Sequence, residues 1–392
     1  MRKEIKIENL VFQGGGAKGI AYIGALKAFE EYFSVDGIQR VAGSSAGSIT
    51  ALLIGLGYTA KEIEDEIIFN LDFSRFKDKP SIFSRLKEYL FNSENIRYMY
   101  KGDVFLEWVK IKIRKKLGNP LATFKDAKMN NYKDMYFIAT NLSKQCEEIF
   151  SYEHTPNMPI SIAVRASMSI PFYFKPVRFS IVDGVYNESG SEIYADGGLT
   201  NNYPIELFDK LKYLSSDERK IVEEKLREKY KKCGIKNKNI DSIEKLKPPD
   251  FENYEHHLNG NYDDNCYHYN KNTFGFKLKS KIEIASLKTE KKIRLPVEIS
   301  NTTAYAVAVS TAILAVRNAV FQEDCNVKSR SAFIDNHGVE TTDFELSADI
   351  KNKLIQSGYQ SLMDEALKIL SQSYLDKRKN TLPNDDPLYS SE

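Results

Sequence analysis

The chain has 392 residues, of which 42% are hydrophobic and 28% charged, a composition typical of a folded globular protein rather than a disordered or fibrous one. Its 56 basic and 54 acidic side chains leave a formal net charge of +2, which argues against a nucleic-acid binder that relies on overall charge. The four cysteines form no CxxC pair, so the sequence indicates neither a disulfide scaffold nor a common metal site.

No export signal is expected from the opening residues, because residues 1–8 alternate charged with apolar side chains where a signal peptide needs a continuous apolar stretch. Two charge-free stretches, at 41–60 and 299–316, are interrupted by Gly, Ser, Asn or Thr and are interpreted as buried helices rather than membrane spans. We therefore expect a cytoplasmic protein, with export by a signal-less route left open.

Predicted strands and helices alternate along the first half of the chain, which favours an α/β fold with a mainly parallel central sheet and helices on both faces. Apolar periodicity predicts strands over 7–12, 39–42, 135–140, 148–152 and 272–278, a hairpin over 177–195, and helices over 17–33, 46–56, 160–168, 301–321 and 347–370. Within the hairpin, turn chemistry occurs at 183–184 and again at 187–190.

The composition changes near Asp209, where a predicted insertion interrupts the main domain. Between Arg219 and Lys238, nine basic residues stand against three acidic ones, a local charge of +6. We expect a main domain over 6–372, a basic irregular insertion over about 209–270 and a polar tail over 373–392. The basic run has two interpretations, a solvated helical face or a surface that attracts anionic lipid headgroups.

A glycine-rich loop, Gly14-Gly15-Gly16-Ala17-Lys18-Gly19, satisfies the GxGxxG pattern between a predicted strand and a predicted helix. This is the setting of a dinucleotide-binding turn, which also needs an acidic residue at the far end of the second strand. Asp36 instead lies in the turn before that strand. A GxGxxG dinucleotide binder is therefore retained only as an alternative interpretation.

Where that acidic residue would stand, the sequence has Gly43-Ser44-Ser45-Ala46-Gly47, followed by a predicted helix of small residues. GxSxG between a strand and a helix is the context of a nucleophile elbow. The two glycines allow a cramped turn, which raises the Ser45 hydroxyl at a helix N-terminus where a developing anion is favoured. The alternative is a tight turn in which small residues simply pack.

The glycine loop has a second role if the first two strands are neighbours. Backbone N–H groups of Gly14, Gly15, Gly16 and Ala46 then converge on one oxygen beside the Ser45 hydroxyl. Such an arrangement of donors is an oxyanion hole.

The group predicted to activate Ser45 is Asp196, which follows a short predicted strand and precedes two glycines. A carboxylate acts as a base toward a serine hydroxyl only in a preorganised and partly dry site. Asp183, at the predicted hairpin tip, is a rival acid. Four of the five histidines follow Asp196, among them His337, so a Ser-Asp-His order is formally available, although no motif surrounds any of them.

These blocks together resemble the patatin-like phospholipase family. Residues 14–19 match its oxyanion loop, residues 43–47 its nucleophile elbow, and Asp196-Gly197-Gly198 the acid of its Ser-Asp dyad. Lesser likenesses lie at 166–171, 201–204 and 272–275. The resemblance covers roughly residues 6–208 and resumes near residue 270.

The resemblance implies a patatin-like three-layer sandwich and a cofactor-independent lipid acyl hydrolase. The implied reaction is phospholipase A-type cleavage of glycerophospholipid acyl esters through an acyl-enzyme. The implied site comprises the catalytic residues Ser45 and Asp196, the oxyanion-hole residues Gly14, Gly15, Gly16 and Ala46, and the supporting residues Lys18, Gly19, Gly43, Gly47, Gly197 and Gly198, with no metal.

The resemblance also implies partners and leaves alternatives open. The partners are a phospholipid or other acyl-lipid substrate, a membrane surface touched transiently, and an activating protein, which several patatin-like bacterial enzymes need. No nucleic acid is expected. The alternatives are specificity for neutral glycerides or galactolipids, or a non-catalytic protein that keeps the fold to bind a ligand.

Overall fold

The computed structural model describes residues 6–66, 76–79, 96, 98–232, 268–289, 308 and 325–370. The chain divides into two compact units, Met1–Ile205 with Asn272–Glu392, and Glu206–Lys271. The polar tail expected over 373–392, and the helix expected over 301–321 apart from residue 308, lie outside the described residues.

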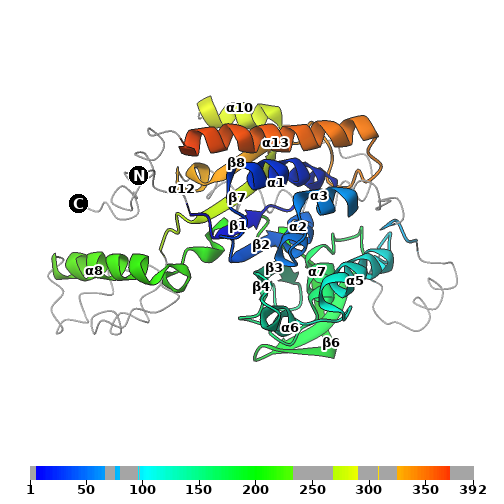
Figure 1. The fold of residues 1–392 in the computed structure, drawn as a ribbon. Coiled ribbons are helices and arrows are strands. Elements are labelled where there is room, and N and C mark those ends of the chain that lie inside the picture. Colours follow the sequence, from blue (N-terminus) through cyan, green and yellow to red (C-terminus); the bar gives the residue numbers. More distant parts are fainter. Residues whose placement is uncertain are drawn as a thin grey trace. The chain divides into compact units, whose positions relative to one another are not determined.

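One mixed sheet of eight strands forms the centre of the first unit (Figure 1). The strands are β1 (Asn9–Phe12), β2 (Arg40–Ser44), β3 (Asp134–Asn141), β4 (Cys146–Phe150), β5 (Val177–Val182), β6 (Val185–Asp196), β7 (Thr273–Lys279) and β8 (Ser331–Asp335). Their order is β5-β6-β3-β2-β1-β7-β8, and β4 also pairs with β3. β3, β2, β1, β7 and β8 run parallel, whereas β4, β5 and β6 pair antiparallel, so the predicted α/β sheet is confirmed.

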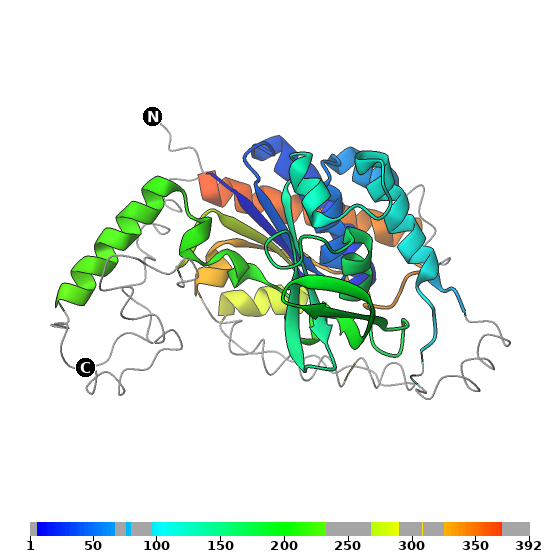
Figure 2. The same cartoon turned by 90° about the horizontal axis from the view of Figure 1, so that it is seen from below.

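Helices cover both faces of this sheet. The described helices of the first unit are α1 (Ala21–Tyr32), α2 (Ala46–Gly55), α3 (Ala60–Glu64), α5 (Asp103–Leu117), α6 (Phe124–Met129), α7 (Ile160–Ser167), α10 (Lys281–Thr289), α12 (Cys325–Ser329) and α13 (Ala348–Leu370). Figure 2 shows α1 and α13 on one side of the strands and α10 on the other. Within the described ranges, no helix is long and apolar enough to cross a membrane.

Close backbone contact joins α1 to α13. A Cβ atom on Gly24 would lie 1.7 Å from the Ile355 carbonyl oxygen, and one on Gly358 would lie 1.9 Å from the Ala21 carbonyl oxygen. Glycine therefore lets the two helices touch along their backbones. The cap predicted for α13 is confirmed, because the Ile350 N–H donates to Ser347 Oγ at 3.3 Å.

Aromatic side chains pack between α1 and the middle of the sheet. The rings of Phe12 on β1 and Phe276 on β7 stack with centroids 4.8 Å apart, and Tyr22 and Phe29 of α1 meet Phe276 edge-on. All four side chains are buried. Burial of this kind is the main stabilising contribution to an α/β core.

The predicted hairpin is present, with one difference from the expectation. β5 and β6 are joined at Asp183 and Gly184, which both have positive φ, as a two-residue hairpin turn requires. The second turn, expected at 187–190, instead lies within β6, where the pairing shifts register opposite Phe179 and Ser180. Residues with turn chemistry are accommodated there as a bulge.

A short helical turn, η5 (Ile205–Phe208), starts at the last residue before the second unit, which also contains η6 (Leu211–Tyr213) and α8 (Ser216–Lys232). Its two described ends are tied together, because the Asn270 N–H donates to Asp209 Oδ1 at 3.0 Å. The described start of the predicted basic run is therefore helical.

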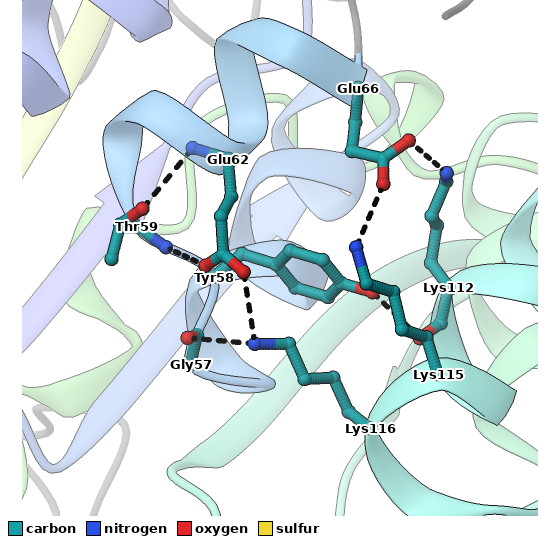
Figure 3. Close-up of polar contacts among 8 residues, drawn as sticks. All are labelled: Gly57, Tyr58, Thr59, Glu62, Glu66, Lys112, Lys115 and Lys116. Carbon is teal, nitrogen blue, oxygen red and sulfur yellow. Dashed lines mark hydrogen bonds and ion pairs between the residues drawn. The ribbon is translucent and has the colours of Figure 1, made fainter.

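A buried ion pair braces α5 against the segment that follows α2 (Figure 3). Glu66 accepts hydrogen bonds from Lys112 and, at 3.2 Å, from Lys115, and the side chains of Glu66 and Lys112 are almost fully buried. The Tyr58 hydroxyl donates to the Lys112 carbonyl oxygen at 3.0 Å, and Lys116 Nζ lies 4.2 Å from the centre of the Tyr58 ring. These contacts hold the segment that follows α2 against α5.

We expect Glu66→Gln to destabilise the protein by about 3 kcal/mol, because it leaves the buried Lys112 ammonium without its carboxylate. The control is Asp65→Asn, which removes an exposed i,i+4 pair with Lys61 and should cost less than about 1 kcal/mol. Urea unfolding of both variants measures the difference. Equal stability of the two variants would contradict a structural role for the buried pair.

Candidate active site

Ser45 occupies a strained turn between β2 and α2. Its backbone has φ 52° and ψ −123°, a conformation that residues other than glycine rarely adopt. Its side chain is buried. Such a conformation costs on the order of 1–3 kcal/mol and persists only where the surroundings enforce it. This is the geometry of a nucleophile elbow.

The two glycines of GxSxG are required by close backbone contact. A Cβ atom on Gly43 would lie 2.2 Å from the carbonyl of Gly47, and one on Gly47 would lie 2.2 Å from the carbonyl oxygen of Phe12. The start of α2 is therefore pressed against the ends of both β1 and β2. Any side chain at either position would move the turn that carries Ser45.

Gly47→Ala should destabilise the protein by about 3 kcal/mol or more, because its methyl group would overlap the Phe12 backbone, which cannot easily shift. Gly37→Ala is the matched control, since a Cβ atom there meets only ordinary contacts at 3.4 Å and 3.6 Å. Thermal unfolding with circular dichroism compares the two. A Gly47→Ala protein as stable as Gly37→Ala would show that the close approach does not constrain the turn.

The end of α7 anchors both Ser45 and the candidate acid. Ser167 Oγ accepts a hydrogen bond from the Ser45 N–H at 3.1 Å, and the Ser169 carbonyl oxygen accepts one from the Asp196 N–H at 2.9 Å. Arg165, buried on the same helix, donates to Ser169 Oγ at 2.5 Å. One short segment thus sets the positions of two residues that are far apart in sequence.

Asp196 lies at the end of β6 with its carboxylate buried. Its Oδ1 accepts the Gly198 N–H at 2.7 Å, and a Cβ atom on Gly197 would lie 2.7 Å from Ser44 Oγ, so this loop lies against the elbow. Burial raises the pKa of Asp196 to about 6, and the Ser45 hydroxyl and the Gly198 N–H limit that rise. Oδ2, however, forms no hydrogen bond of regular geometry within the described part of the chain.

The stability of the protein should depend on this carboxylate. An unfolded aspartate titrates near 3.9, so a folded-state pKa of about 6 means that ionising Asp196 costs about 3 kcal/mol of stability. The protein is therefore more stable by this amount below about pH 4, where Asp196 is neutral, and loses that extra stability as the pH rises to about 6. Asp196→Asn should therefore unfold several degrees above the wild type at pH 8, with the gap closing toward pH 4.

The matched control for that measurement is Asp183→Asn, the same chemical change at the exposed hairpin tip. It should leave the melting temperature nearly unchanged at both pH values. Identical melting curves for Asp196→Asn and the wild type at pH 8 would contradict a costly buried charge.

The glycine loop lies beside Ser45, although its donors differ from the prediction. A Cβ atom on Gly14 would lie 3.1 Å from the Ser45 Cβ. The Gly14 N–H, however, donates to the Asn202 carbonyl oxygen at 2.9 Å, so Gly14 is not a free donor here, contrary to the expectation from the sequence. The N–H groups of Gly15, Gly16 and Ala46 have no acceptor among the described residues.

Contacts that the sequence did not reveal support this loop. The Thr341 carbonyl oxygen accepts the Ala17 N–H at 3.1 Å and would clash with a Cβ atom on Gly16, which has φ 56°. Gly19 lies close to the Ala46 side chain, so the loop is packed against the elbow as well. No sequence signal marks Thr341, whereas Ser167 and Asn202 fall within the lesser likenesses noted above.

The described histidines make other contacts. His154 Nδ1 lies 2.7 Å from Ser151 Oγ, and the exposed His337 lies beside Asp335 with its Nδ1 3.8 Å from Oδ2. His268 belongs to the second unit, and His256 and His257 lie outside the described residues. In the described part of the chain, no histidine is hydrogen-bonded to Ser45 or Asp196, and no group of three or more His, Cys, Asp or Glu side chains could hold a metal ion.

A family comparison agrees with this geometry. Residues 10–209, slightly more than half of the chain, match the family described as patatin-like phospholipase. The chain belongs to this family. Membership places it among the patatin-like lipid hydrolases and confirms the fold that the motifs implied.

Relatives of the patatin-like chain include viral proteins. Over 207 residues it is 38% identical to the uncharacterized protein R571 of Acanthamoeba polyphaga mimivirus, covering 53% of this chain and 63% of that one. It is 30% identical to the probable lipid hydrolase 463L of Invertebrate iridescent virus 6, covering 51% and 62%. The matches therefore span less than two thirds of either relative. The crystal structure of VipD from Legionella pneumophila aligns with a TM-score of 0.49 and 16% identity, over 92% of this chain and 67% of that one.

Proposed function

We propose that this patatin-like protein hydrolyses acyl esters of glycerophospholipids, as a phospholipase A-type enzyme, with Ser45 as the nucleophile and Asp196 as the base. The observation that carries the proposal is the strained Ser45 turn with the buried Asp196 carboxylate against it. Family membership and the relative named a probable lipid hydrolase support the substrate class. Glycerophospholipids reside in bilayers, so the proposal includes transient contact with a lipid surface.

In the first half-reaction, ionised Asp196 takes the proton of the Ser45 hydroxyl as Oγ attacks the ester carbonyl carbon. The N–H groups of Gly15, Gly16 and Ala46 stabilise the negative oxygen that forms, each typically worth a few kcal/mol. The tetrahedral intermediate then expels the lysolipid alkoxide, which receives the proton from Asp196. The fatty acyl group remains attached to Ser45 as an ester.

Water completes the cycle by the same steps. Asp196 takes a proton from water, the resulting hydroxide adds to the acyl carbonyl, and Ser45 leaves with the proton that Asp196 returns. The burial of Asp196 serves this role, because a pKa of about 6 makes the carboxylate a stronger base than an exposed aspartate while leaving it ionised at neutral pH.

Hydrolysis of a fluorogenic acyl ester and of a phospholipid panel tests the proposal. Ser45→Ala and Asp196→Asn should each lower kcat at least about 1,000-fold, since each removes a group that takes part in bond making or proton transfer. In the wild type, kcat/KM should rise with pH and level off above about 6, as the Asp196 carboxylate ionises.

The control is Ser161→Ala, which removes a buried hydroxyl on α7 that has no hydrogen-bond partner among the described residues and should leave hydrolysis unchanged. Retained activity in Ser45→Ala would contradict the dyad, and loss of activity in His337→Ala with the fold intact would point to a triad. Products are identified by mass spectrometry. Cleavage of neutral glycerides or galactolipids but not of phospholipids would replace the proposed substrate.

A further inference from the structure

Two lysines on β7 lie level with the glycine loop. β7 runs parallel to β1 with Phe276 paired to Phe12, so the next residues of the two strands continue side by side. Gln13 Oε1 accepts the Leu278 N–H at 2.8 Å. A Cβ atom on Gly15 would lie only 2.5 Å from Leu278 Cδ1, so Leu278 is the β7 side chain that packs against the loop. Lys277 and Lys279 flank Leu278 and project from the opposite face of the strand.

Both lysines are buried, with only 5% of Lys277 and 6% of Lys279 exposed. Lys277 Nζ lies 5.0 Å from the centre of the Tyr203 ring and pairs with no carboxylate among the described residues. Lys279 Nζ lies 3.8 Å from Glu283 Oε1 on α10. Unpaired lysines are rarely buried, because a charge removed from water needs a partner.

The negative charge near these lysines is too small to balance them. Glu283 attracts Lys277, Lys279 and also Lys18 of the glycine loop, while it accepts hydrogen bonds from the N–H and Oγ of Ser280 at 2.7 Å and 2.8 Å. The other carboxylate that acts on Lys18 is Glu340, which is exposed and therefore screened by solvent. Within the described part of the chain, three lysines thus share two carboxylates.

The proton affinity of Lys277 reflects its burial first and the neighbouring Lys279 second. Burial and the neighbouring Lys279 lower its pKa to about 7, and Glu283 offsets only part of that effect. An anion placed between Lys277 and Lys279 would remove the repulsion between them and favour the charged form of both.

We propose that Lys277 and Lys279 bind a phosphate group at the C-terminal end of β7. In hydrolysis this would be the phosphate of a glycerophospholipid headgroup, a role that rests on the function proposed above; inorganic phosphate has the same chemistry. Lysine binds phosphate as a point charge, and two lysines from one strand face supply two such charges. The ends of β7, β1 and β2 meet at one edge of the sheet, so a phosphate there would lie on the edge that carries Ser45.

Lys277→Met and Lys279→Gln test the headgroup role with two soluble esters, dihexanoylphosphatidylcholine and dihexanoylglycerol, which differ in the phosphate-bearing group. Each variant should lower kcat/KM for the phospholipid about ten-fold or more, the loss expected when a charge-assisted contact is removed. Hydrolysis of dihexanoylglycerol should be unchanged. The control is Lys353→Gln, which removes an equal charge from the exposed surface of α13 and should affect neither ester.

Calorimetry with inorganic phosphate tests the anion site without hydrolysis. Ser45→Ala protein should bind phosphate, and adding Lys277→Met should weaken that binding about ten-fold or more. Phosphate binding that depends on Lys277, together with unchanged selectivity between the esters, would support a site for free phosphate and overturn the headgroup role. Phosphate binding that is absent, or indifferent to both lysines, would overturn the anion site.

These two arms separate failure of this inference from failure of the proposed function. If the wild type hydrolyses neither ester, the proposed function is wrong, and calorimetry still decides the anion site. If the wild type hydrolyses both esters and the lysine variants match it on both, the function stands and the headgroup role is wrong. Circular dichroism of each variant verifies that the fold is retained.

Discussion

The backbone of Ser45 is the constraint on which the candidate site depends. A serine with positive φ is unstable by itself, so the surrounding structure must hold it in place. Three contacts do so: Gly47 at the start of α2 lies against the end of β1, Gly43 lies against the backbone of Gly47, and Ser167 Oγ accepts the Ser45 N–H. Strain that is held this firmly fixes the direction of the hydroxyl before any substrate arrives.

Burial gives Asp196 two opposed properties. The same removal of water that makes the carboxylate a usable base also makes its charged form unfavourable in the folded protein. Burial also disfavours the charged form of Lys277, and therefore lowers its pKa where it raises that of Asp196. Ionisable groups kept in unfavourable surroundings are a common mark of functional sites, whereas the paired Glu66 and Lys112 serve the fold.

Much of the fold and the centre of the site could be predicted from sequence because their signals are local. Alternating strand and helix segments predict a parallel sheet. The pattern Gly43, Ser45, Gly47 predicts a tight turn between a strand and a helix from five consecutive residues. The tertiary partners could not be predicted. Whether the Gly14 N–H is free depends on Asn202, and the support of the loop by Thr341 depends on how distant segments pack. Residues 187–190 carry turn chemistry, but Asn187 and Glu192 both pair with β5, so the residues between them form a bulge in β6.

The position of β1 has a consequence for the order of folding. β1 lies between β2 and β7, and Asn9 Nδ2 donates to Thr273 Oγ1 across 264 residues of sequence. The anchor of Ser45 is also distant, since Ser167 follows it by 122 residues. Contacts this distant form late, because a long loop must close before they are made. During synthesis, the central strand would therefore present an unpaired edge until most of the chain has emerged. The turn of the candidate nucleophile is therefore synthesised well before the segment that anchors it.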